Sequence, residues 1–151
     1  MKLELELVPS SAFFKNLRNS LGLKWGKVSN AVRSHYGYQC QLCLFKGKHS
    51  QVHLHETWEY NDETHIQRLK EFKCVCETCH NVIHWGRSQV SGKNMEKLLE
   101  HARTVNGCSA HDFKKHVKKS FEIWEERSQH EWLCQFEHYA ELIPCGAKSE
   151  H

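Results

Sequence analysis

The sequence predicts an α+β domain in which short strands and helices are held together by a bound zinc ion. Three observations lead to this class. Residues 3–7 and 51–60 alternate apolar and polar side chains with the period of a β-strand. Other segments repeat apolar residues at the spacing of amphipathic helices. Two Cys-x-x-Cys pairs have the spacing of zinc knuckles: Cys40 and Cys43, Cys76 and Cys79.

The size of the chain and its cysteine content limit the classes of protein that fit. Its 151 residues suit one domain, residues 1–151, with a modest core that a metal would help to stabilise. No apolar run approaches the ~20 residues needed to cross a bilayer, and the first residues lack the layout of a signal peptide. We therefore expect a cytoplasmic protein without a membrane partner. In that setting the eight cysteines favour metal binding over disulfides.

The charge is uneven along the chain. Residues 1–55 contain eight lysines and arginines and two acidic residues, whereas residues 120–151 contain two basic and seven acidic residues. A basic first part fits a protein that binds nucleic acid. Ordinary solvated charges explain the same pattern equally well.

Short elements are expected before the first cysteine pair. Residues 3–7 predict a strand, because three leucines alternate with glutamates there. A helix should follow, capped by Ser10 or Ser11 and ending near Gly22. Apolar spacing predicts a second helix over about 25–36.

The central segment predicts a strand, a loop and a helix. Residues 51–60 form the strand, and two histidines two positions apart share one of its faces: His53 and His55. The polar residues 61–71 are expected to form a loop with a helical turn. Residues 76–87 then predict a turn that enters a helix, which Gly86 breaks.

Two amphipathic helices are predicted after this segment. The first ends at Gly107, and Ser109 is expected to cap the second. We expect both helices, about residues 93–128, to pack on the motif core, about residues 36–90.

The four knuckle cysteines are expected to bind one structural zinc ion. Each Cys-x-x-Cys turn places two thiolates on the metal, and two turns complete a tetrahedral site with Zn–S distances of ~2.3 Å. All four positions are then filled by protein, so this zinc stabilises the fold and binds no substrate. Cys74 lies two residues before Cys76, and we interpret it as a packed thiol. Three other cysteines stand alone: Cys108, Cys134 and Cys145.

His80 and His84 are four residues apart on the predicted helix, so both imidazoles project from one face and can share a cation. His55, delivered by the strand, would add a third nitrogen and leave a coordination position open. A metal nuclease needs such a site, because the ion polarises the scissile phosphate while a nearby base activates water. The helical spacing alone fits equally well with histidines that only cap and solvate the helix.

These motifs resemble a known family. A Cys-x-x-Cys pair, a strand with His-Glu, and Cys-x-x-Cys-His-x-x-x-His are similar to the HNH endonucleases of the ββα-metal type, with an added four-cysteine zinc. The similarity to a bacterial HNH-like protein group extends over nearly the whole chain through the segments LELVPSSAFFKNLR, HETWEY, IQRL, CETCHNVIHWG, TVNG and WEERS. The resemblance implies a ββα-metal fold. With the elements predicted above, the expected architecture is this core with an N-terminal strand and helices and a C-terminal helical extension.

The resemblance also implies an activity and its ligands. It implies cleavage of DNA phosphodiester bonds with a divalent ion, either Mg²⁺, Mn²⁺ or a second Zn²⁺. The catalytic ion would be bound by His55, His80 and His84, and the structural zinc by the knuckle cysteines.

The general base is where this sequence departs from the family. HNH enzymes of the HH or DH kind have a histidine directly after the strand ligand, and Glu56 stands there. A carboxylate, with a pKa near ~4.3, is a weaker base than imidazole. Three interpretations stay open: Glu56 is the base with a pKa raised by burial, His53 or His65 reaches the water, or the site binds metal without turnover. We rank Glu56 with His55 first, because its one-residue offset from His55 follows the motif. A register in which His55 is the base and His53 a ligand is also open.

Basic residues near the metal are expected to contact phosphates: Lys46, Lys48, Arg68, Lys70 and Arg87. Trp58 and Trp85 flank the site and either stack on a base or pack against the helix and strand.

The sequence therefore predicts a divalent-metal-dependent HNH endonuclease acting on DNA. The alternative is a catalytically silent zinc module of the same fold that binds DNA or a protein partner. The residue that distinguishes the two predictions is Glu56, which stands where these nucleases have a histidine as general base.

Overall fold

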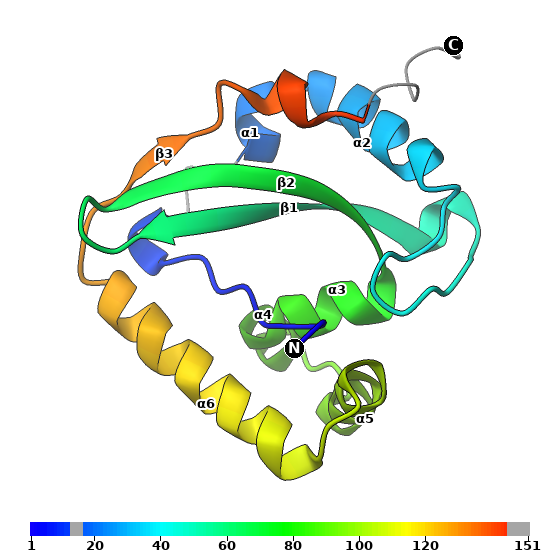
Figure 1. Cartoon of the computed structure of the whole chain (residues 1–151), viewed down its shortest axis with the longest axis vertical. Coiled ribbons are helices and arrows are strands. Elements are labelled where there is room, and N and C mark those ends of the chain that lie inside the picture. The colour runs from blue at the N-terminus through cyan, green and yellow to red at the C-terminus, as the bar shows by residue number, and fades with distance from the viewer. Residues whose placement is uncertain (13–16, 145–151) are drawn as a thin grey trace.

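A computed structural model describes residues 1–12 and 17–144, and it is an α+β fold built on a long β-hairpin (Figure 1). Strands β1 (Val52–Asn61) and β2 (Ile66–Cys76) pair antiparallel. The short strand β3 (Leu133–Gln135) adds to β2 in parallel, which gives the order β1-β2-β3.

The helices lie on both sides of this hairpin (Figure 1). One side carries α1 (Leu17–Leu21) and α2 (Lys24–His35). The other side carries α3 (Glu77–Ile83), α4 (Trp85–Val90), α5 (Met95–Asn106) and α6 (Ala110–Arg127). Three short 3-10 turns complete the part of the fold that is described: Ser10–Ala12, His49–Gln51 and Tyr139–Leu142. Within the described part of the chain, every helix is too short or too polar to span a membrane.

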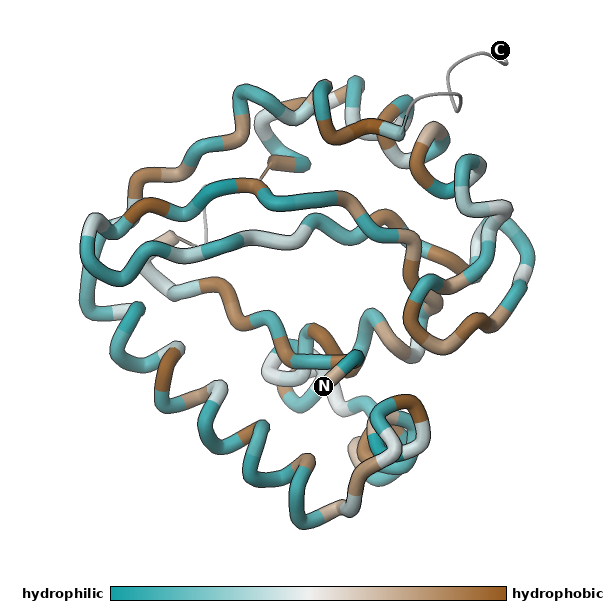
Figure 2. Tube along the Cα trace, in the orientation of Figure 1, coloured by the Kyte–Doolittle hydropathy of each residue, from teal (hydrophilic) through white to brown (hydrophobic). Residues whose placement is uncertain are grey.

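Each face of the hairpin has its own apolar core, because successive side chains of a strand point to opposite faces. The core under α1 and α2 contains Leu17, Val28, Val32, Leu54, Leu69 and Phe72. The core on the side of α3 to α6 includes Leu3, Leu5, Val75, Val82, Ile83, Trp85 and Phe113. Figure 2 shows brown, hydrophobic positions on both sides of the hairpin, and mostly hydrophilic positions along α6.

A β-bulge interrupts the hairpin. Thr57 lies opposite Glu71, but the next residue, Trp58, lies opposite Leu69. Lys70 is therefore the extra residue of β2. The inserted residue keeps Leu69 on the same face as Phe72, so that both reach the core under α1 and α2.

The N-terminal segment (residues 2–8) runs between the hairpin and α3 (Figure 1), and the prediction of a strand over 3–7 is wrong. Side chains of α5 and α6, together with the end of α3, bond its backbone in place of a neighbouring strand. Asn106 accepts from the Leu3 N–H at 2.7 Å and donates to the Leu3 carbonyl at 2.8 Å. The Glu6 N–H donates to the Ile83 carbonyl at 3.0 Å. The alternating leucines face the core, as in a strand, without any sheet partner.

Three other sequence predictions differ from the structure. Residues 66–71 belong to β2, although they were expected in a loop, since the bulge hides their alternation. The helix after the second knuckle is broken at His84, whose φ of −95° and ψ of 51° are not helical, and Gly86 lies inside α4. The first helix was expected to begin at Ser10 or Ser11; a 3-10 turn and α1 occupy its described part, and residues 13–16 lie outside the description.

The predictions for the two helices after residue 92 are confirmed. Helix α5 ends at Gly107, which has φ +62°. The Ser109 hydroxyl accepts the Asp112 N–H at 3.1 Å and caps α6. Helix α5 packs on α3, so the C-terminal helices do fold back on the motif core.

The two hydrogen bonds between Asn106 and Leu3 predict a measurable contribution to stability. Replacing Asn106 by Ala leaves one backbone donor and one acceptor without their partner, and should cost about 1–3 kcal/mol of unfolding free energy in urea denaturation. Replacing the exposed Gln89 of α4 by Ala is the control and should change it by less than about 0.5 kcal/mol. Equal stabilities of the two variants would contradict this role of the N-terminal segment.

Candidate metal centres

The four knuckle cysteines come together at one end of the hairpin. The sulfurs of Cys40, Cys43, Cys76 and Cys79 all lie within 4.8 Å of one another. Cys40 and Cys43 sit in the turn after α2, while Cys76 ends β2 and Cys79 lies in the first turn of α3. This confirms that the two distant Cys-x-x-Cys pairs form a single cluster.

Each knuckle turn is held by backbone N–H groups that point at sulfur. The N–H groups of Leu42 and Cys43 both approach the Cys40 Sγ at 3.4 Å. The Cys79 N–H approaches the Cys76 Sγ at 3.4 Å, so that Cys76 also caps α3. Such bonds stabilise negative charge on sulfur, which is the form that binds a metal.

The four sulfurs cannot all be ionised together unless a cation lies between them. Hydrogen bonding with Cys76 and Cys79 holds the pKa of Cys40 far below its usual range. The same interaction with Cys40 raises the pKa of Cys76 to about 12, and hydrogen bonds to Cys40 and Cys76 raise the pKa of Cys79 well above its usual range. A tetrahedral thiolate set is the donor chemistry of a structural zinc, and these residues fit it.

His101 is a neighbour of the sulfur cluster that sequence analysis missed. Its Nε2 lies 3.1 Å from the Cys79 Sγ, and it reaches the cluster from α5. A ring N–H directed at a bound thiolate is a typical outer contact of a metal ligand. The contact joins the C-terminal helices to the cluster, and no motif in the sequence signals it.

The remaining cysteines of the described chain lie outside this cluster. Cys74 is fully buried, and burial raises the pKa of its thiol to about 11, which agrees with its interpretation as a packed thiol. Cys108 and Cys134 are half-buried and belong to no metal-binding group. Cys145 lies outside the described residues.

Three histidines form a second cluster beside the first. The ligand nitrogens of His55, His80 and His84 all lie within 4.8 Å of one another. The Nε2 atoms of His80 and His84 are 3.1 Å apart, and the ring of His55 is 5.5 Å from that of His80 and 5.2 Å from that of His84. Strand β1 contributes the first ring, and α3 with its C-terminal break contributes the other two.

Burial keeps two of these imidazoles neutral. Burial, reinforced by the neighbouring histidines, lowers the pKa of His80 to about 2, and burial with the nearby His55 and Arg87 lowers the pKa of His84 to about 3. Both are therefore uncharged at neutral pH. Neutral imidazole is the form that ligates a metal.

Glu6 is the most important site residue that the sequence analysis missed. Its Oε2 lies 2.5 Å from the Nε2 of His55, a side chain that is only 5 % exposed. A carboxylate partner fixes the tautomer and orientation of a metal-binding histidine. In the sequence, this segment shows alternating leucines and glutamates. That pattern predicts a β-strand and does not indicate a contact with His55.

The candidates for the general base lie in different places. Glu56 alternates with His55 along β1 and therefore faces α1 and α2, where burial raises its pKa, countered in part by His55 and Arg18. His53 is on the face of His55, and its ring stacks on that of His80 at 5.3 Å. His65 lies beyond the far end of β1, stacked on His130 at 4.2 Å. The structure thus brings His53 to the histidine cluster and separates Glu56 and His65 from it.

The five basic candidates are spread over the surface. Arg87 is close enough to the cluster for its charge to lower the pKa of His53, His80 and His84. Lys46 and Lys48 are exposed in the turn after the first knuckle. Arg68 pairs with Glu59 at 3.5 Å near the other end of the hairpin. Lys70, the bulge residue, lines a cavity on the side of the histidines.

The two tryptophans have different surroundings. Trp85 is buried, with its ring 5.6 Å from that of Phe113, so it packs in the core. Trp58 packs partly against the core under α1 and α2 and also lines the cavity that contains Lys70.

Comparison with known proteins found no match to this chain among family models, curated proteins or solved structures. The geometry alone therefore defines the class: an α+β protein with a candidate metal site of four cysteines and a neighbouring group of three histidines.

The sulfur cluster leads to a prediction about zinc. The purified protein should contain zinc, and removing it with a strong chelator should unfold residues 40–79, seen as lost amide-exchange protection, because the ion joins two distant turns. Replacing Cys79 by Ser should lower the zinc content by one ion per chain.

Two variants serve as controls for this prediction. Replacing Cys74, a buried thiol outside the cluster, by Ala should leave the zinc content unchanged. Replacing His84 by Ala should leave the zinc at the cysteines and the fold nearly intact. A zinc-free protein whose melting temperature does not respond to the chelator would contradict the assignment.

Proposed function

We propose that this protein is a metal-dependent endonuclease of the HNH type that hydrolyses DNA phosphodiester bonds. The observation that carries the proposal is the convergence of His55, His80 and His84 from a strand and a helix. The resemblance of the sequence motifs to the HNH family supports it independently.

The donor atoms limit which ion fits the histidine cluster. Three imidazoles suit Zn²⁺ and the other later transition ions better than Mg²⁺, which prefers oxygen ligands. When bound, the ion would polarise the scissile phosphate and stabilise the leaving oxygen. His80, in α3, and His84, at its C-terminal end, would hold the ion, and the hydrogen bond from Glu6 fixes the orientation of the His55 ring.

We assign the general base to His53. It lies on the same face of β1 as His55 and next to His80, whereas Glu56 faces the opposite side of the hairpin. Burial lowers the pKa of His53 below its ordinary value, so its ring is neutral and able to accept a proton at neutral pH. Arg87, on the exposed side of α4, is placed to contact a phosphate near the cluster.

The silent zinc module is the second candidate function, and the position of Glu56 is the observation that favours it. If the residue directly after His55 is the only general base that this motif provides, the histidine cluster has no base, because Glu56 faces the other side of the hairpin. The protein would then bind DNA or a protein partner without cleaving it.

A plasmid assay separates the two candidates. Incubation of supercoiled plasmid with the zinc-loaded protein and added Zn²⁺, Mn²⁺ or Mg²⁺ should give relaxed or linear product. Replacing His80 by Ala should reduce cleavage to the level of chelator-treated protein, whereas replacing the exposed His111 of α6 by Ala should leave it unchanged. Intact plasmid together with a mobility shift would support the silent module instead.

The base assignment predicts a specific ranking of variants. Replacing His53 by Ala should lower the cleavage rate by about 10²–10⁴-fold with the metal content unchanged, which is the usual contribution of a general base. Replacing His65 by Ala, or Glu56 by Gln, should have little effect, because both side chains lie away from the cluster. A large loss in the Glu56 variant with a normal His53 variant would show that the base is misassigned.

A further inference from the structure

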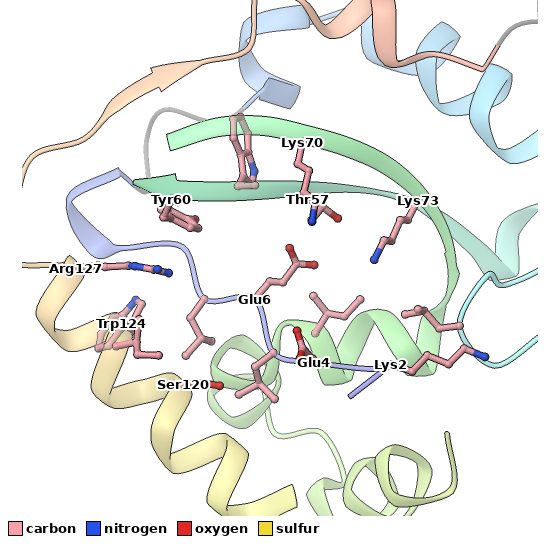
Figure 3. Close-up of a pocket in the computed structure, with 16 residues that line it drawn as sticks. Lys2, Glu4, Glu6, Thr57, Tyr60, Lys70, Lys73, Ser120, Trp124 and Arg127 are labelled. Carbon is pink, nitrogen blue, oxygen red and sulfur yellow. The ribbon is translucent and has the colours of Figure 1, made fainter. Parts of the chain in front are cut away.

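A cavity lies between the hairpin, the N-terminal segment and α6 (Figure 3). Its volume is about 320 Å³, at the lower end of the range for small-ligand sites. Glu6 lines it and bonds to His55. Lys73 lines it as well and is the cross-strand neighbour of His55 in the register of the hairpin. The cavity therefore adjoins the histidine cluster through Glu6 and Lys73.

Two lysines make one part of this cavity suitable for an anion. Lys70 is the bulge residue of β2, and the bulge turns its side chain into the cavity, on the same side as Lys73 (Figure 3). Among the residues that the structure describes, no ion pair forms with Lys70, and Lys73 has only a 3.7 Å contact with Glu71. Two ammonium groups with a single, long ion-pair contact between them are a suitable contact for one phosphate.

The opposite part of the cavity is aromatic and held in place. Tyr60 lies there with the Arg127 guanidinium 4.5 Å from its ring centre, and Arg127 is itself fixed by Asp62 at 2.8 Å and 3.0 Å. Trp124 is held by a bond from its indole N–H to the Val8 carbonyl at 2.9 Å. Rings held in this way form a preorganised wall for a flat apolar group.

We propose that this cavity binds one nucleotide of the nucleic-acid substrate, with its phosphate at Lys70 and Lys73 and its base at the wall of Tyr60 and Trp124. The inference rests on the proposed function, since it assigns the cavity to the same substrate. Glu4 and Glu6 also line the cavity and disfavour a second anionic group, which limits the ligand to one phosphate. A base in such a cavity must be unpaired, so the preferred substrate is single-stranded or frayed DNA.

Calorimetric titration of the zinc-loaded protein with 5′-dTMP, in buffer without added divalent ions, tests the cavity apart from catalysis. We expect 5′-dTMP to bind at least about tenfold more tightly than thymidine or inorganic phosphate, since only the nucleotide occupies both parts. Lys70→Gln and Lys73→Gln should each weaken binding by about tenfold, the usual effect of losing a charged contact to phosphate. Lys118→Gln, the same change on the exposed surface of α6, is the matched control and should not change it.

The outcomes separate this inference from the proposed function. Equal affinity for 5′-dTMP and inorganic phosphate, or variants at Lys70 and Lys73 that bind like the control, would overturn the nucleotide site even if the protein cuts DNA. Lysine-dependent binding of 5′-dTMP by a protein that cuts nothing would uphold the site and reject the nuclease. If the nucleotide site and the nuclease activity are both found, the two lysine variants should raise KM for a single-stranded oligonucleotide more than they lower kcat.

Discussion

The structure depends on one constraint, the convergence of four sulfurs at the start of α3. Cys79 and His80 are adjacent in this helix, and a turn of about 100° per residue directs one to the sulfur cluster and the other to the histidines. Whatever holds Cys76 and Cys79 therefore also sets the direction of the imidazoles of His80 and His84. Because an ion that binds four thiolates leaves no coordination position open, its effect on the histidine cluster is geometric and not chemical.

The N-terminal segment connects the two halves of the site. It carries Glu6 to His55, supplies two buried leucines to the core beside α3, and forms one wall of the cavity. Its backbone is tied to helices that come a hundred residues later, through Asn106 and His116. The C-terminal helices thus support the site, although none of the proposed metal ligands comes from them.

The pairs within each metal-binding cluster could be predicted from the sequence because the spacing inside each pair is local, and the structure brings these pairs together. Cys-x-x-Cys turns, histidines four apart on a helix and an alternating strand each report on geometry within a few residues. Glu6 and His101 could not be found in this way, since each reaches its partner through the tertiary fold. The second strand was missed for a related reason: the extra residue Lys70 breaks the period of two that identifies a strand. The motif predicts Glu56 as the general base because it directly follows His55. Adjacent residues of a strand point to opposite faces, however, so Glu56 faces away from the histidine cluster.

The tether between the N-terminal segment and the last long helices has a consequence for the order of events during synthesis. Glu6 leaves the ribosome early, yet the side chains that fix its backbone neighbours, Asn106 and His116, emerge a hundred residues later. Until then His55 lacks its carboxylate partner and the cavity lacks the wall that α6 provides. In the proposed nuclease, the histidine cluster and the cavity would therefore be complete only after α5 and α6 have been synthesised.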